Sequence, residues 1–145
     1  EITTAFYVTK KRQLHGFITF RRELQTGFTS LCEVATEYDQ SLLPILNGIV
    51  KSNDIVGSCN LQSIVTSSGE IFPFEINGRI SGTNSIRSQF GFKDVQYTIE
   101  ENLLNKEPSE PNISKGSASR VLFDVIFPEQ TLASPKSKNS KHYIF

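Results

Sequence analysis

The sequence predicts an α+β domain, an antiparallel sheet of about five or six strands with helices packed on one face. Runs of β-branched and aromatic residues, which are typical of strands, recur along the chain. Short polar or glycine-containing segments separate neighbouring runs, as in antiparallel hairpins. Other segments repeat their apolar residues every three or four positions, which is the spacing of an amphipathic helix. The 145 residues, 37% of them hydrophobic, suffice for one core.

The first expected strands form a hairpin. Residues 2–9 and 14–20 are rich in β-branched and aromatic side chains, and the polar residues 10–13 between them have the character of a loop. A further strand is expected over residues 28–34, after a polar stretch that ends in Gly27. The chain therefore opens with three strands that are close in sequence.

The first expected helix covers residues 40–50 and ends near residues 52–53. Its apolar positions recur at three- and four-residue spacing, in the two series Leu42, Leu46, Ile49 and Leu43, Leu46, Val50. Pro44 lacks an amide hydrogen, so we expect it to lie in the first turn.

Residues 59–65 and 71–80 are expected to form a second hairpin. A two-residue turn at residues 68–69 would pair residues whose numbers sum to 137. Gln62 then lies opposite Glu75, and Asn60 lies opposite Asn77 in the same way.

Side chains alternate between two faces along the second strand of this hairpin. The face expected to lie in the core carries Phe72, Phe74 and Ile76. The opposite, polar face carries Pro73, Glu75, Asn77 and Arg79.

Two short helices are expected next. Thr83 or Ser85 would cap a helix that runs to Gln89 and ends at Gly91. Asp94 would cap a second helix over residues 95–104, whose apolar stripe consists of Val95, Ile99 and Leu103.

The C-terminal part is expected to contain one more strand. Residues 105–116 are rich in loop-forming residues, and the apolar run 120–127 predicts a buried strand. The domain would cover residues 1–128, and residues 129–145, rich in Lys and Ser, would form a frayed tail.

Composition argues against several classes of function. The chain has 15 Lys and Arg residues against 15 Asp and Glu residues, so it lacks the positive charge that sequence-independent nucleic-acid binding needs. It has no run of about 18 apolar residues to cross a membrane. Cys32 and Cys59 lack the spacing of a zinc site and are expected to be buried thiols in a cytoplasmic protein. Because the chain opens directly on a strand and contains no Met, we expect it to be an internal piece of a larger protein.

The polar face of the second hairpin could carry chemistry. Mg²⁺ prefers oxygen ligands, which Gln62, Glu75 and Asn77 offer from one side of the sheet. Arg79 would add a forked donor for phosphate oxygens. Polar alternation alone is more often the solvent-exposed face of a strand, so the spacing leaves both interpretations open.

The same segment resembles a known family. Residues 69–83, GEIFPFEINGRISGT, follow Asn60-Leu61-Gln62 and resemble the metal-binding hairpin of the ATP-grasp superfamily. The resemblance is closest to the branch that includes the large subunit of carbamoyl phosphate synthetase. Residues 1–8 resemble the strand that follows the adenine-binding hinge of the family, and the resemblance extends over residues 1–106.

The resemblance implies ATP and two Mg²⁺ ions, or Mn²⁺ in their place, as cofactors. By similarity Glu75 would bridge both ions, and Gln62 and Asn77 would each complete one of them. Arg79 would contact the nucleotide phosphates as a catalytic group, and Glu1 would approach the ribose. The implied reaction is phosphorylation of a carboxylate substrate to an acyl phosphate, followed by attack of a nucleophile. Phosphoryl transfer of this kind depends on positioning and charge neutralisation.

The chain also departs from the family pattern. Gly78 replaces the usual Pro, and Gly82 stands where the synthetase has a second Arg. The glycine-rich lid and the phosphate-binding Lys belong to the N-terminal half of the family's ATP-binding domain, which this chain lacks. We therefore expect the chain alone to be inactive. The alternatives are a non-catalytic nucleotide- or protein-binding module, and one half of a split protein that needs a partner chain; an open sheet edge could also pair two copies into a homodimer.

Overall fold

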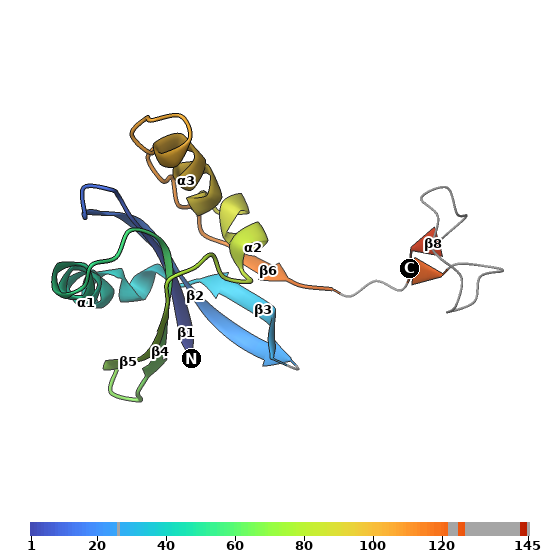
Figure 1. Ribbon diagram of the computed structural model, residues 1–145. Coiled ribbons are helices and arrows are strands. Elements are labelled where there is room, and N and C mark those ends of the chain that lie inside the picture. The colour runs from blue at the N-terminus through green and yellow to red at the C-terminus, as the bar shows by residue number, and fades with distance from the viewer. Residues whose placement is uncertain (26, 122–124, 127–142, 145) are drawn as a thin grey trace, which may run out of the picture.

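A six-stranded antiparallel sheet is the centre of the fold, which confirms the predicted α+β class (Figure 1). The computed structural model describes residues 1–25, 27–121, 125–126 and 143–144. The strand order is β5-β4-β1-β2-β3-β6, and consecutive neighbours are antiparallel. The strands are β1 (Ile2–Val8), β2 (Leu14–Gln25), β3 (Phe28–Val34), β4 (Gly57–Val65), β5 (Ile71–Asn77) and β6 (Ser117–Ser119).

The helices lie on both faces of the sheet, whereas the sequence led us to expect them on one. They are the 3₁₀ turn η1 (Thr36–Tyr38) and the helices α1 (Asp39–Ser52), α2 (Asn84–Gln89) and α3 (Asp94–Asn102). On one face Phe6 packs with Leu42 of α1, and on the other Tyr7 packs with Tyr97 of α3 (Figure 1). Every residue of β1 is buried, because this central strand is covered from both sides.

Helix α1 contains Pro44 beyond its first turn, where we had not expected it. Proline cannot donate to the carbonyl of Gln40, four residues earlier. Pro44 lies on the exposed side of α1, where water can reach that carbonyl. The opposite side of the helix buries Leu42, Leu46 and Val50, and this burial stabilises the helix despite the lost hydrogen bond.

The hairpin β4–β5 has the predicted register at its polar positions but a different turn. Gln62 lies opposite Glu75, and Asn60 lies opposite Asn77. Nearer the turn the pairing is shifted by one residue, because residues 67–69 form a longer loop than the two-residue turn we expected. Residue 74 is an extra residue in β5, a bulge that lies between the pairs Ser63–Pro73 and Gln62–Glu75. The bulge shifts the pairing back by one residue and so restores the predicted partner of Gln62.

The predicted core face of β5 is exposed. Phe72 and Phe74 each expose 54% of their surface, and Ile76 exposes 46%. β5 is an edge strand, and the apolar clusters of the two faces centre on the inner strands. Ile71 packs against the core on the α1 side instead.

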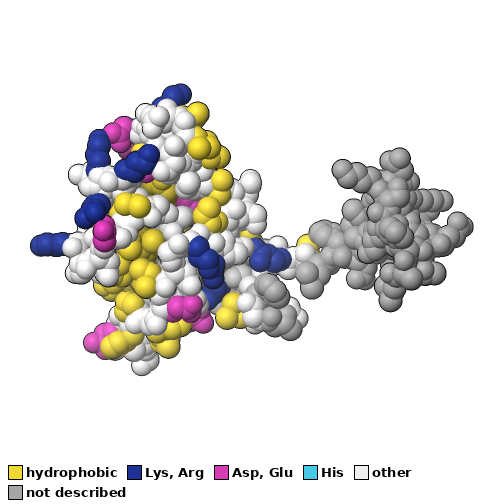
Figure 2. Space-filling view, viewed as in Figure 1, with side chains coloured by type: hydrophobic (Ala, Val, Ile, Leu, Met, Phe, Trp, Pro, Cys, Tyr) yellow, Lys and Arg dark blue, Asp and Glu magenta, His cyan; other side chains and the backbone are white. Residues whose placement is uncertain are grey.

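Helix α3 also has the opposite orientation to the one predicted. Val95, Ile99 and Leu103 are exposed, whereas the buried side of the helix carries Asp94, Tyr97 and Glu101. The buried polar groups all have protein partners, described below. Figure 2 shows apolar side chains along α3 and over β5, and Lys and Arg side chains interspersed with Asp and Glu.

The C-terminal part differs from the predicted buried strand over residues 120–127. The strand β6 ends at Ser119, and Val121 exposes 60% of its surface. β7 (Val125–Ile126) pairs with β8 (Tyr143–Ile144), so part of the expected frayed tail is a strand. The remainder of the predicted tail lies outside the described residues, whereas residues 105–116 form the predicted loop.

Two further predictions concern the cysteines and membrane-spanning helices. Both cysteines are free and buried, as predicted. Among the residues that the structure describes, none of the helices is both long and apolar enough to span a bilayer.

Candidate functional site

A continuous chain of side-chain hydrogen bonds crosses one face of the sheet from β2 to β5. Arg22 Nη2 donates to Gln62 Oε1 at 2.7 Å and also pairs with the carboxylate of Glu1. Gln62 Nε2 donates to Glu75 Oε2 at 2.7 Å, and Asn77 Nδ2 donates to Glu75 Oε1 at 2.8 Å. Four of the five predicted site residues, Glu1, Gln62, Glu75 and Asn77, therefore belong to one connected group.

The pairing of the strands places these side chains together. Residues that lie opposite each other on neighbouring strands point to the same face, so Gln62 and Glu75 share a face with Asn60 and Asn77. Asn60 is buried and accepts a hydrogen bond from Thr3 Oγ1 at 3.0 Å, so it anchors β4 to β1. Gln62, two residues along, is only half-buried.

Arg22 is a member of this group that sequence reasoning missed. Its side chain is 14% exposed, and it joins Glu1 to Gln62 across three strands. The signal was present, because a β1–β2 hairpin with a loop at residues 10–13 places Arg22 opposite Glu1. A groove of about 500 Å³ adjoins this end of the group and is lined by Glu1, Arg22 and residues of β2 and β3.

The side chains of this group could supply some, but not all, of the ligands of a hard cation. Within it, Gln62, Glu75 and Asn77, called the Glu75 group below, offer one carboxylate and two amide oxygens, which are ligand types that Mg²⁺ accepts. The amide nitrogens of Gln62 and Asn77 now face Glu75, so either amide would have to rotate to present its oxygen to an ion. The part of the chain that the structure describes contains no cluster of three His, Cys, Asp or Glu residues suited to a metal. Further ligands, such as phosphate oxygens and water, would have to complete the coordination.

Arg79 lies apart from this group. Its Nη1 donates to the carbonyl of Ile80 at 3.4 Å, and its side chain is exposed. It lines a pocket of about 370 Å³ together with Lys10, Tyr7 and Glu101. Gly78, Arg79 and Ile80, which directly follow β5, form one side of this pocket, and Arg79 makes no hydrogen bond to Gln62, Glu75 or Asn77.

Buried polar groups line this pocket. Tyr7 Oη donates to Glu101 Oε2 at 3.0 Å, and the amide of Lys10 donates to Glu101 Oε1 at 2.8 Å. Burial, together with the hydrogen bond to Glu101, raises the pKa of Tyr7 to about 12. Sequence reasoning missed Glu101, although Asp94, Tyr97 and Glu101 follow the three- and four-residue spacing of one helix face.

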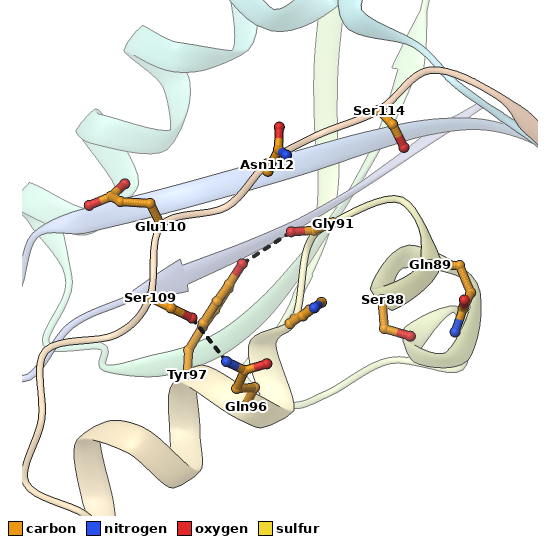
Figure 3. A pocket seen from close by; sticks show the side chains of 10 residues that line it. Ser88, Gln89, Gly91, Gln96, Tyr97, Ser109, Glu110, Asn112 and Ser114 are labelled. Carbon is orange, nitrogen blue, oxygen red and sulfur yellow. Dashed lines mark hydrogen bonds between the residues drawn. The ribbon is translucent and has the colours of Figure 1, made fainter.

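A larger polar cavity of about 840 Å³ lies between α2, α3 and residues 109–114 (Figure 3). Hydroxyl and amide groups line it. Tyr97 Oη donates to the carbonyl of Gly91 at 3.3 Å, and Gln96 Nε2 donates to Ser109 Oγ at 3.1 Å. None of the predicted site residues lines this cavity.

Comparison with known proteins finds similarity in structure only. No family model matches the chain, and no curated protein matches it. The phosphoribosylaminoimidazole carboxylase ATPase subunit from Aquifex aeolicus matches with a TM-score of 0.69 and 9% identity, over 99% of this chain and 51% of that one. N5-carboxyaminoimidazole synthase from Aspergillus clavatus, crystallised with ADP and 5-aminoimidazole ribonucleotide, matches with a TM-score of 0.62 and 13% identity, over 74% of this chain and 30% of that one. N5-carboxyaminoimidazole synthetase from Staphylococcus aureus matches with a TM-score of 0.63 and 11% identity, over 77% and 31%.

The chain spans about half or less of the length of these enzymes. Identities of this size show a shared fold. The chain therefore has the fold of one part of the N5-carboxyaminoimidazole synthetases, the likeness extending over most of its length.

Proposed function

We propose that this chain is the C-terminal part of the ATP-binding domain of an ATP- and Mg²⁺-dependent carboxylate ligase of the ATP-grasp superfamily. The observation that carries the proposal is the Gln62–Glu75–Asn77 group, three oxygen-bearing side chains in contact on one sheet face. The shared fold supports it, because structures with this fold have been crystallised with ADP. The ligase would transfer the γ-phosphoryl group of ATP to a carboxylate, releasing ADP, and a nucleophile would then attack the acyl carbon and displace phosphate.

The proposal gives each residue of the group a role. Glu75 would bridge two Mg²⁺ ions, which Mn²⁺ could replace, while Gln62 and Asn77 would each bind one of them. The ions would neutralise the charge on the nucleotide phosphates, which is the main requirement of phosphoryl transfer. Glu1 would lie beside the ribose, at the groove lined by Glu1 and Arg22.

Arg79 is the proposed catalytic cation. It would contact the nucleotide phosphates from the pocket that begins after Asn77. Lys10 lines the same pocket, and Glu101 is already engaged by Tyr7 and by the amide of Lys10. The two cations make this end of the site suitable for anionic phosphate and carboxylate groups.

As the finer assignment we propose a relationship to the carbamoyl phosphate synthetase branch, which rests on the motif at residues 75–79. The remainder of the ATP-binding domain, with a lid over the phosphates, would come from outside the 145 residues. We also propose a cytoplasmic protein. The open edge of β5 is the surface at which a second copy could pair as a homodimer.

A second candidate is one half of a nucleotide site that a separate chain completes. This candidate rests on the same Gln62–Glu75–Asn77 contacts. The two candidates share the Glu75 group and differ in where the other half is encoded.

Titration calorimetry with MgATP, on the protein that contains this chain, tests the proposal. We expect Glu75→Gln to weaken binding by about tenfold or more, because it removes the only carboxylate of the group. Glu70→Gln is the matched control, since Glu70 lies exposed in the loop of the same hairpin and accepts only a hydrogen bond from Ser68 among the side-chain contacts described. Unchanged MgATP affinity and ligase activity in Glu75→Gln and Asn77→Ala would refute the assignment.

A further inference from the structure

A fully buried ion pair lies outside the Glu75 group, between α2 and α3. The side chains of Arg87 and Asp94 are 1% and 0% exposed. Arg87 Nη2 donates to Asp94 Oδ2 at 2.5 Å, and Arg87 Nε donates to Asp94 Oδ1 at 3.1 Å. The pair is bidentate, which fixes the orientation of the guanidinium plane.

The same guanidinium holds the segment that follows β5. Arg87 Nη1 donates to Ser81 Oγ at 2.7 Å and to Thr83 Oγ1 at 3.1 Å. The two hydroxyls also contact each other at 3.1 Å. The carbonyl of Thr83 accepts the backbone amide of Arg87, so side chain and backbone both tie α2 to residues 81–83.

Asp94 connects this network to the sheet. The hydroxyl of Ser58, on β4, donates to Asp94 Oδ2. The sequence predicted Thr83 or Ser85, and Asp94, as helix caps; Thr83 does occupy the N-cap position of α2, but its side chain makes no capping hydrogen bond, and the N-cap of α3 is Lys93. Both side chains instead bind Arg87, because a buried guanidinium needs acceptors for its donors.

The network has more polar groups than helix packing alone requires. Buried ion pairs can often be replaced by well-packed apolar residues with no loss of stability, so they are weak evidence of a stabilising role. Phe92 and Tyr97 already supply apolar contact between this region and the sheet. What the network does provide is a fixed position for residues 81–83, next to the exposed segment that carries Arg79.

We propose that Arg87 and Asp94 are positioning residues that fix residues 81–83 relative to β4 and thereby hold Arg79, two residues earlier, in the pocket that it lines with Lys10 and Glu101. The effect on nucleotide rests on the function proposed above. The effect on the segment itself does not. The two parts are therefore tested by separate measurements.

Hydrogen exchange tests the position of the segment. Ser81→Ala/Thr83→Val removes the two hydroxyls and leaves the ion pair intact, whereas Arg87→Met/Asp94→Leu replaces the ion pair with apolar side chains. Ser88→Ala is the matched control, because it removes an exposed hydroxyl of α2 that bonds only within that helix. The amides of Asn84, Ile86 and Arg87 report on the segment, because they donate to the carbonyls of Ser81 and Thr83. We expect their exchange to be about tenfold faster in both double variants and unchanged in the control.

Two outcomes of this measurement would overturn the proposal. One is unchanged exchange of the Asn84, Ile86 and Arg87 amides in Ser81→Ala/Thr83→Val. The other is exchange that rises by the same factor in α1, which would mean that the network serves global stability only.

MgATP binding tests the consequence for Arg79 in a double-mutant cycle. We expect Arg79→Ala to weaken MgATP binding about tenfold in the wild-type background and less than about twofold in Ser81→Ala/Thr83→Val. The second loss is smaller because a guanidinium that the network no longer positions contributes little to binding. Equal losses in the two backgrounds would show that the network does not act through Arg79. If the wild-type protein does not bind MgATP, the proposed function fails, and the exchange measurement alone decides whether the network fixes the segment.

Discussion

Tyr7 is a residue whose chemistry follows directly from its position. It lies on the central strand, is fully buried, and donates to Glu101 across the gap to α3. Removing it from water disfavours the phenolate, and the neighbouring carboxylate disfavours it further. The pKa of Tyr7 rises from its ordinary value of 10.0 to about 12 as a result.

This shift predicts how stability depends on alkaline pH. Between about pH 10 and pH 12 the unfolded chain loses the Tyr7 proton while the folded chain keeps it, so this contribution to stability is complete below pH 10 and declines above it, by at most about 1.4 kcal/mol per pH unit. Tyr7→Phe lacks the contribution. We expect the difference in unfolding free energy between wild type and Tyr7→Phe to shrink across this range, measured by urea denaturation. A difference that stays constant with pH would contradict the assignment.

At the scale of single elements, α1 buries Leu42, Leu46 and Val50 as its apolar spacing predicts, although Pro44 lies beyond its first turn. Leu46 is fully buried against the sheet, whereas Leu43, three residues earlier, is 46% exposed. We expect Leu46→Ala to lower the free energy of unfolding by about 2–5 kcal/mol, because it removes buried methyl groups and leaves a cavity. Leu43→Ala, the same chemical change on the solvent side, should cost less than about 1 kcal/mol in the same chemical denaturation experiment. Similar losses for the two variants would place the helix in a different rotation.

Helix α3 shows the opposite case. Val95, Ile99 and Leu103 are exposed, because the buried side of the helix faces polar partners from other elements, Arg87 of α2 for Asp94 and Tyr7 of β1 for Glu101. The periodicity of a helix is read from the hydrophobicity of each position alone. Hydrophobicity does not indicate whether a polar residue is buried against a hydrogen-bond partner from another element.

The orientation of α3 leads to a stability prediction that reverses the sequence pattern. Tyr97 is 1% exposed, whereas Ile99 is 43% exposed. We expect Tyr97→Ala to cost about 3–5 kcal/mol and Ile99→Ala less than about 1 kcal/mol. Thermal unfolding followed by circular dichroism would measure both. A larger loss for Ile99→Ala would restore the orientation that the sequence suggested.

The whole molecule shows which features a sequence can predict. The hairpins and the partners of Gln62 were predictable, since the pairing of neighbouring strands follows from local pattern and loop length. The placement of helices on both faces was not, because covering β1 from two sides depends on segments far apart in sequence. Arg79 lies apart from the polar face predicted for it, and the reason is local. β5 ends at Asn77, so the alternation of a strand no longer sets the direction of the side chains that follow.

Nucleotide binding should be visible in the stability of the whole protein. A ligand that binds only the folded state at 100 times its dissociation constant adds about 2.7 kcal/mol to the free energy of unfolding. We expect MgADP to raise the melting temperature of the protein that contains this chain. Mg²⁺ alone should have little effect, because the Glu75 group offers a single carboxylate. An equal shift with ADP and excess EDTA would argue against a metal at this site.

The bulge at residue 74 also bears on how the hairpin can vary. The loop at residues 67–69 and the bulge each shift the pairing by one residue, in opposite directions, and the shifts cancel before the Gln62–Glu75 pair. The length of the loop therefore does not change which residues pair at Gln62 and Glu75. Homologous chains could shorten or lengthen this loop, with a matching loss or gain at the bulge, and still present the same three side chains, so variation in hairpin length need not signal a change in chemistry.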